Sequence, residues 1–233
     1  MRSLLPLLSL VILGCSGAPT VFGGGEGGGH AVSGCDPSAA PTRFISCVLS
    51  FEPGVGAGFG QVSDVPGGRQ FPEIIYGPPQ GTGTGSGSTD VLSLGGGGEI
   101  SFGVGGNAIV DGPGVDFIVF ENAFDVGGDP DAPYAEPGVV SVSEDAVTWV
   151  DFPCQKDTYP YTGCAGWHPV LSNPDNGLSP FDPAAAGGDP FDLADVGVKQ
   201  ARYVRARDVS FCGASPSEGF DLDAAAIVNA MDP

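Results

Sequence analysis

Basic residues, histidine and helix-forming patterns are all scarce in this chain of 233 residues. Only 8 Lys and Arg stand against 28 Asp and Glu, which leaves a formal net charge of −20. A surface of that sign repels nucleic-acid phosphates and anionic lipid headgroups, so we expect no nucleic-acid partner and no direct adhesion to a bilayer. With 40 Gly and 22 Pro, apolar residues rarely recur at helical spacing, which argues against a helical bundle.

Catalytic signatures are missing as well. The sequence contains no G-x-S-x-G nucleophile elbow and no H-E-x-x-H zinc motif, and it has only 2 His. A nucleophilic triad would have to use His168, which lies between Trp167 and Pro169 in a predicted loop. Pairs of carboxylates can be drawn from any Asp-rich chain, so they do not by themselves predict a glycosidase. We expect a protein that is not an enzyme, with a carboxylate-dependent hydrolase as the remaining catalytic alternative.

The first residues are typical of a secretion signal. Arg2 precedes an apolar run over residues 4–13 that is too short to cross a bilayer as a helix. The run ends in Ile12-Leu13-Gly14-Cys15, which resembles the lipobox of bacterial lipoproteins; an ordinary signal peptide with an incidental cysteine is the alternative. The resemblance implies a signal peptide over residues 1–14 and fatty acyl chains such as palmitate on Cys15, and Ser16 after it implies transit to the outer membrane.

Residues 15–34 contain the predicted lipidated cysteine and a Gly-rich segment, VFGGGEGGGHAVSG, that ends at Gly34. Glycine at this density has too little side chain to bury and behaves as a flexible tether. From residue 35 to residue 233, about 200 residues without an interrupting linker predict one domain with its own core.

Short β-branched or aromatic runs bounded by turn residues recur through this region, which is the pattern of an all-β sandwich or barrel. Short helical turns are expected at residues 184–186 and 193–194, and Trp149 is expected in the core. Arginines in the strand around residue 205 should pair with acidic residues across a strand face. The expected strands cover residues 44–51, 73–76, 91–94, 99–104, 116–120, 139–142, 148–152, 201–209 and 220–228.

The cysteines favour local disulfides, since an exported protein meets an oxidising environment. Cys35 lies close to Cys47 in sequence, and Cys154 lies close to Cys164. Each pairing would close a loop of about a dozen residues, worth roughly 3 kcal/mol on the chain-entropy model. Cys212 is then left over, and pairings that include it stay open because sequence alone does not fix connectivity.

Two acidic motifs flank apolar runs, DGPGVDFIVFENAF at residues 111–124 and GFDLD at residues 219–223. Carboxylate and amide oxygens are the ligands that Ca²⁺ prefers, and alternate residues of a strand project from the same face. If the two motifs meet in the fold, they predict a structural calcium site; hydrogen bonding to backbone amides is the alternative. The predicted ligands are Asp116, Glu121, Asn122, Asp221 and Asp223, with Asp111 and Asp125 close to them in sequence.

Three loops carry other candidate features. Residues 125–131, DVGGDPD, are rich in oxygen ligands but do not match the EF-hand pattern, so a solvated loop is expected. Residues 81–85, GTGTG, look like a phosphate cradle but lack the lysine and the helix that follow one, so a flexible loop is expected over residues 81–88. Trp167 and His168 lie in GCAGWHP beside a predicted disulfide, where they either bind a ligand or pack beneath the loop.

Two segments resemble discoidin-like domains. VSVSEDAVTW at residues 140–149 resembles their V-x-V-S-x-D-G-x-x-W hairpin, although Ala146 stands where Gly is usual, and ARYVR at residues 201–205 resembles their A-R-Y-V-R strand. The resemblance implies a galactose-binding-like jelly-roll β-sandwich that binds carbohydrate or lipid headgroups, often with structural calcium. The order of motifs between residues 44 and 229 is also similar to a family of bacterial cell-surface lipoproteins of uncharacterised function, which transfers no activity.

The sequence therefore predicts an outer-membrane lipoprotein with one β-sandwich that binds glycan or another extracellular surface polymer without catalysis, stabilised by calcium. Its contact with the membrane should come through the lipid anchor alone. A structural or adhesive surface module without a small ligand is the alternative.

Overall fold

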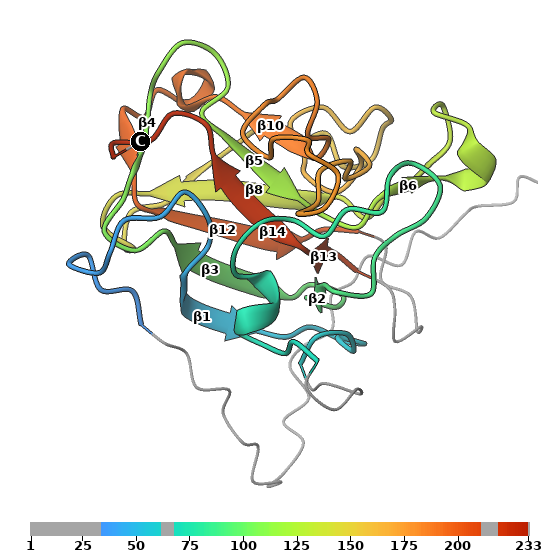
Figure 1. The fold of residues 1–233 in the computed structure, drawn as a ribbon, viewed down its shortest axis with the longest axis horizontal. Coiled ribbons are helices and arrows are strands. Elements are labelled where there is room, and N and C mark those ends of the chain that lie inside the picture. Colours follow the sequence, from blue (N-terminus) through green and yellow to red (C-terminus); the bar gives the residue numbers. More distant parts are fainter. Residues whose placement is uncertain (1–33, 62–67, 211–218, 233) are drawn as a thin grey trace, which may run out of the picture.

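The computed structural model describes residues 34–61, 68–210 and 219–232 (Figure 1). The predictions on the signal peptide, on Cys15, on the tether up to residue 33 and on Cys212 fall outside these residues.

Within the described residues the chain is all-β, with three short 3₁₀ helices and no α-helix, which confirms the predicted fold class. The elements are β1 Cys47–Glu52, η1 Glu73–Ile75, β2 Leu92–Ser93, β3 Glu99–Gly103, β4 Ile109–Val110, β5 Phe117–Phe120, β6 Phe124–Asp125, η2 Val126–Gly128, β7 Pro133–Tyr134, β8 Gly138–Ser143, β9 Val150–Asp151, β10 Asp189–Phe191, η3 Leu193–Val196, β11 Gln200–Ala201, β12 Tyr203–Asp208, β13 Asp221–Leu222 and β14 Ala224–Ile227.

Two antiparallel sheets make the body of the molecule. The larger has the strand order β1-β3-β12-β8-β9, and the smaller has the order β10-β5-β14 (Figure 1). Val204 of β12 pairs with Phe102 on one side and with Val142 on the other. These side chains share one apolar cluster with Phe117 and Val119 of β5, so the two sheets pack face to face in a sandwich-like arrangement.

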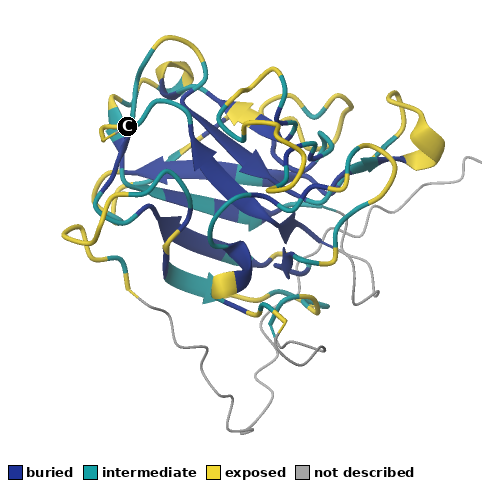
Figure 2. Ribbon diagram, in the orientation of Figure 1, coloured by how far each residue is buried: buried dark blue, intermediate teal, exposed yellow. Residues whose placement is uncertain are grey.

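Strand β5 is buried on both faces, which explains why its sequence is continuously apolar. Phe117 and Val119 face the cluster between the two sheets, while Ile118 and Phe120 face a second cluster that includes Val170. Figure 2 shows β5 and its neighbour β14 buried along their length. The central position predicted for residues 116–120 is correct, and it fixes the place of the polar residues at the two ends of the strand.

Two local predictions were wrong. Where a strand was predicted over residues 73–76, Glu73–Ile75 form the 3₁₀ helix η1, because Ile74 and Ile75 are both buried while the backbone closes local turns such as Tyr76 N to Glu73 O at 3.1 Å. Trp149 is half-buried and lies outside the core, where the Arg205 guanidinium covers its ring at 4.6 Å from the centroid.

The outer face of the larger sheet carries the ion pairs expected for its arginines. Arg205 lies 3.4 Å from Asp151 and 3.8 Å from Glu99, and Arg207 contacts the same two carboxylates at 3.8 and 4.0 Å. Arg202 instead donates to the carbonyl oxygen of Asn107 at 3.3 Å. The cross-strand pairing is therefore confirmed for two of the three arginines.

The turn between β8 and β9 explains why glycine suits the position of Ala146. Ala146 has φ of 61°, in the left-handed region that favours glycine. Asp145 accepts hydrogen bonds from the backbone N–H groups of Val147 at 2.9 Å and Thr148 at 2.7 Å, and these hold the turn. The same bonds lower the pKa of the Asp145 carboxyl to about 2.

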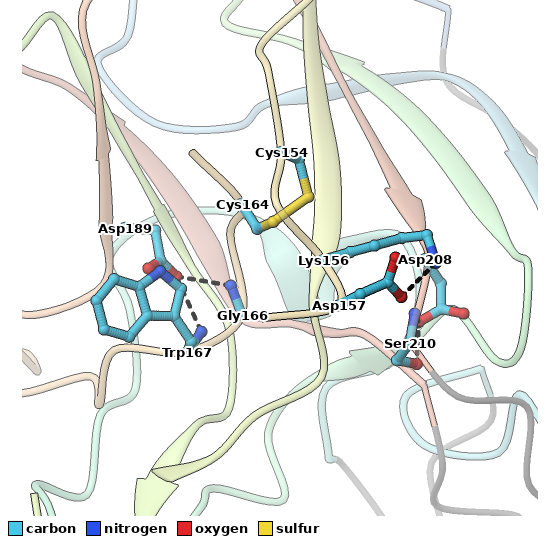
Figure 3. Close-up of a disulfide and its surroundings, with 9 residues drawn as sticks. All are labelled: Cys154, Lys156, Asp157, Cys164, Gly166, Trp167, Asp189, Asp208 and Ser210. Atoms are coloured by element: carbon cyan, nitrogen blue, oxygen red, sulfur yellow. Dashed lines mark hydrogen bonds and ion pairs between the residues drawn. A yellow bond between two sulfur atoms is a disulfide. The ribbon is translucent and has the colours of Figure 1, made fainter. Parts of the chain in front are cut away.

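Both locally paired disulfides are present. Cys35 is bonded to Cys47 at the start of β1, and Cys154 is bonded to Cys164 across the loop after β9. The second bridge closes the loop that precedes Trp167 and His168 (Figure 3).

Candidate functional site

The two acidic motifs meet at one end of the smaller sheet. β14 pairs with β5 so that Ala224 lies opposite Phe120, which brings the residues just outside both strands together. The Asp221 N–H donates to Glu121 Oε1 at 3.1 Å, and the Asp223 N–H donates to the Phe120 carbonyl at 3.0 Å. Residues a hundred positions apart in sequence are therefore neighbours.

Asp116 does not join them, which corrects its place among the predicted calcium ligands. It precedes β5 whereas Glu121 follows it, and five residues of extended strand separate two Cα atoms by about 16 Å. Asp116 is fully buried and accepts hydrogen bonds from Gly112 N at 2.9 Å, Asn229 Nδ2 at 2.8 Å and Leu193 N at 2.7 Å. Its contacts are those of a structural carboxylate.

Asp116 also belongs to a separate acidic group with Asp111 and Asp192. Among the described residues, this is the one group of three metal-ligating side chains whose oxygens all lie within 4.8 Å of one another. Asp111 is paired with Lys199, and Asp192 accepts from the Ala194 N–H at 2.9 Å as the cap of η3. Each carboxylate of this group therefore already has protein partners, although Lys199 is the only charged one among the described residues.

Hydrogen bonding to backbone amides, the alternative to calcium, is present in the second motif. Three consecutive N–H groups each donate to a different buried carboxylate: Gly219 to Glu136 at 2.7 Å, Phe220 to Asp208 at 3.0 Å and Asp221 to Glu121 at 3.1 Å. One oxygen of Glu121 is thus used to hold the backbone in place, and the other is free for a different role.

Three carboxylate oxygens in this region are buried and have no hydrogen-bond partner. They are Glu121 Oε2, Asp221 Oδ1 and Asp223 Oδ1, on side chains that are 1%, 3% and 2% exposed. Ser93 and Asn122 lie near the Asp221 carboxyl, but neither forms a hydrogen bond of ordinary geometry to Oδ1. Buried oxygens without partners are unusual because each loses its solvation without compensation.

Burial disfavours the charged form of these groups, so their pKa values rise. Desolvation raises the pKa of Asp223 to about 7 and that of Asp221 to about 6. The pKa of Glu121 is raised well above its usual value, first by desolvation and then by the neighbouring charges of Asp221 and Glu136. Any negative charge that Glu121, Asp221 and Asp223 carry without a cation beside them therefore lowers the stability of the fold.

A small cavity lies against two of the three carboxylates. Glu121, Asn122 and Asp223 line one side, and the Gly-rich segments 81–83 and 86–88 line the other. The cavity leaves about 10 Å³ for the centre of a water-sized sphere, which is close to what one water molecule requires. Asp221 is not part of its lining.

The segment 81–88 is anchored by hydrogen bonds, which corrects the expectation of a flexible loop. Gly81 N donates to Ser172 O and Gly83 N donates to Val170 O, both at 3.1 Å, and Gln80 N donates to Asp223 Oδ2 at 2.8 Å. A Cβ on Gly87 would lie 2.6 Å from Asn122 Oδ1. Glycine is thus needed at this position for close approach to the site.

The predicted ligand-binding residues lie on the other side of β5, against β10. Asp189 of β10 is buried and accepts from Gly166 N at 2.6 Å and Trp167 N at 3.3 Å (Figure 3). Its second oxygen lies 2.7 Å from His168 Nδ1. Burial raises the pKa of Asp189, while the bond to His168 opposes that rise. Asp189 thus fixes both the loop and the orientation of the imidazole.

Aromatic rings gather around this histidine. The Trp167 and His168 rings lie 3.5 Å apart between centroids, and Tyr159 meets Trp167 edge to face at 6.1 Å. Tyr161 meets Tyr159 in the same way at 6.0 Å. Tyr159 is 46% exposed, so this cluster, which we name the aromatic loop (Tyr159, Tyr161, Trp167 and His168), presents ring surface to solvent.

Several functional side chains were not predicted from the sequence. Asp189, Glu136 and Asp208 are buried carboxylates that position the two regions, yet Asp189 and Glu136 stand beside Gly or Pro like ordinary turn residues, and Asp208 is the last residue of β12. Only their contacts across strands distinguish them from the many solvated aspartates of the chain.

No protein-family model and no curated protein matches the sequence. Among the residues that the structure describes, no helix combines the length and the apolar character needed to pass through a bilayer. The function therefore has to be inferred from the side chains themselves.

Proposed function

We propose that this protein is a lipid-anchored module of the outer membrane that binds glycan at the aromatic loop without chemical conversion. The observation that carries the proposal is the row of aromatic rings that leads from His168 through Trp167 to exposed Tyr159, held by the Cys154–Cys164 disulfide and by buried Asp189. Sugars bind to proteins through ring stacking combined with a few fixed polar groups, and aromatic rings beside a fixed imidazole supply both.

The charges around the loop favour an uncharged sugar. The formal net charge of −20 repels carboxylated or sulfated glycans. His168 Nδ1 is occupied by Asp189, and in the described parts of the chain no group forms a hydrogen bond to the other ring nitrogen. That nitrogen is positioned to bond a sugar hydroxyl. A hydrolase of the triad type would also need a serine or cysteine nucleophile hydrogen-bonded to the imidazole, and among the described residues the His168 ring is hydrogen-bonded to Asp189 alone.

The type of β-sandwich is a second part of our proposal. We propose a jelly roll of the galactose-binding-like type, supported by where the two discoidin-like segments lie. Residues 140–149 contribute to β8 and its turn, and residues 201–205 contribute to β12, which pairs with β8 so that Val204 lies opposite Val142. Segments separated by fifty residues are thus adjacent strands, as a shared fold requires.

Replacing Trp167 with alanine is expected to weaken glycan binding by about 30-fold, because a central aromatic contact is worth about 2 kcal/mol. The measurement is screening of neutral glycans on an array, followed by calorimetric titration of the best one. Phe59→Ala is the matched control, since Phe59 is 39% exposed on a different loop. An array that stays blank for the wild type would favour the structural or adhesive alternative.

Replacing Cys15 with serine is expected to move the protein from the membrane fraction to the soluble fraction. Two or more acyl chains give stable anchoring, and without the thiol no diacylglycerol can be attached. Detergent phase partition with immunoblotting, together with incorporation of labelled palmitate, measures the change. If the variant stayed with the membrane, the anchor would have to be something other than Cys15.

A further inference from the structure

The strongest unexplained feature outside the aromatic loop is the cavity between Glu121, Asp223 and the segment 81–88. Two of its lining residues, Glu121 and Asp223, each have one buried carboxylate oxygen without a hydrogen-bond partner, Oε2 and Oδ1 respectively. The described Lys, Arg and His side chains form no ion pair with either residue. Arg69, the nearest cation to Asp223, is already engaged by Asp90 at 2.9 Å.

We propose that this cavity is a calcium site in which Glu121 and Asp223 provide the charged ligands. Calcium takes six to eight oxygen ligands and accepts irregular geometry, whereas magnesium demands an octahedron and dehydrates reluctantly. The cavity has room for about one water-sized particle, and its carboxylate-bearing residues Glu121 and Asp223 are buried. A bare calcium ion would give both unpartnered oxygens the positive charge that the protein itself does not supply.

The rest of the cavity wall suits the same ion. Glycine at positions 81, 83 and 87 adds no side chain to a wall otherwise formed by Thr82, Ser86 and Ser88, and backbone carbonyls and hydroxyl oxygens can both bind calcium. Asn122 lines the cavity too, although its Oδ1 accepts from the Ser88 N–H and so holds the loop. Asp221 lies behind Glu121 and adds negative charge without lining the cavity.

This assignment differs from the ligand set predicted from the sequence. Glu121 and Asp223 remain as charged ligands, Asn122 becomes a residue that positions the loop, and Asp116 is excluded because it lies at the other end of β5. Asp221 contributes through its charge. The inference does not depend on glycan binding, since the cavity and the aromatic loop share no residue.

The test is calcium titration of the purified, chelator-treated protein at pH 7.5, followed by calorimetry and by thermal unfolding. We expect one site per chain and a rise in Tm of about 5 °C or more in 1 mM calcium. Glu121→Gln and Asp223→Asn should each weaken binding by at least about tenfold, since each removes one of two ligand charges. Asp111→Asn, in the rival acidic group, should bind like the wild type.

A second variant tests the shape of the cavity without changing its charge. In Gly87→Ala the new Cβ would lie 2.6 Å from Asn122 Oδ1, so either the Asn122 side chain or the loop must shift, and calcium binding should weaken while the fold is kept. The proposal is overturned if wild-type protein shows no calcium heat and no shift in Tm, which would leave a water in the cavity. It is also overturned if Asp111→Asn abolishes binding while Glu121→Gln and Asp223→Asn keep it.

Discussion

Replacing Asp116 with alanine is expected to lower the free energy of unfolding by at least about 3 kcal/mol. The carboxylate is fully buried and accepts from Gly112 N, Leu193 N and Asn229 Nδ2. Removing it leaves three donors in the interior, two of them backbone groups, and each unsatisfied donor costs about 1–3 kcal/mol. Urea unfolding followed by fluorescence measures the loss as a lower midpoint.

Two further variants separate this effect from a general loss of charge. Asp111→Ala removes a carboxylate whose partner, Lys199, is 85% exposed, so it should change stability by less than about 1 kcal/mol. Asp116→Asn keeps one acceptor oxygen but turns an NH₂ group toward a donor, so it should lie between the wild type and the alanine variant. An alanine variant as stable as the wild type would mean that these donors find other partners.

The predicted role of Asp116 shows what sequence reasoning could and could not reach. An apolar strand between residues 116 and 121 was predicted correctly, and its length alone sets the two residues about 16 Å apart. The strand geometry therefore excluded Asp116 from any ion bound at Glu121. What the sequence could not show is that Leu193 and Asn229 reach Asp116 from distant parts of the chain, next to the local donor Gly112.

The same limit applies to the rest of the fold. Alternation predicted the buried faces of β3, because Ile100 and Phe102 point into one core. It failed at η1, where two consecutive isoleucines are both buried, and at Trp149, where an aromatic residue lies beneath an arginine on the outer face. In both cases contacts from other elements overrode the local pattern.

The metal-free protein is expected to lose stability as the pH rises from about 4 to about 7. The folded-state pKa of Asp223 is about 7 and that of Asp221 is about 6, both above the usual value of 3.8. A carboxyl with a raised folded-state pKa stabilises the fold most below its unfolded pKa, and that stability is lost as the pH rises through the folded value. Three pH units at Asp223 alone correspond to about 4 kcal/mol.

The groups that face Glu121, Asp221 and Asp223 change this pH dependence of stability in both directions. Negative charge on neighbouring carboxylates raises these pKa values, while hydrogen bonds and one arginine lower them. The pKa of Asp145 is lowered to about 2, so its titration changes stability only below about pH 4. It therefore does not overlap with the loss of stability expected between pH 4 and pH 7. The facing groups are Glu136, Asp208, Asp90 and Arg69, with the backbone N–H of Gln80 and the side chains of Ser93 and Asn122.

Asp223→Asn should therefore stabilise the metal-free protein at pH 7.5, by up to about 4 kcal/mol, although it removes a buried carboxylate. Asparagine can keep the hydrogen bond from Gln80 N, which the native Oδ2 accepts at 2.8 Å, while the buried charge is gone. Unfolding in chelator at pH 4.5 and pH 7.5 measures the change, and the variant should show a flatter pH dependence than the wild type or Asp111→Asn. If the carboxylate were purely structural, the variant would be less stable at both pH values. Stabilisation confined to the higher pH identifies a charge that the fold tolerates only when a cation is bound beside it.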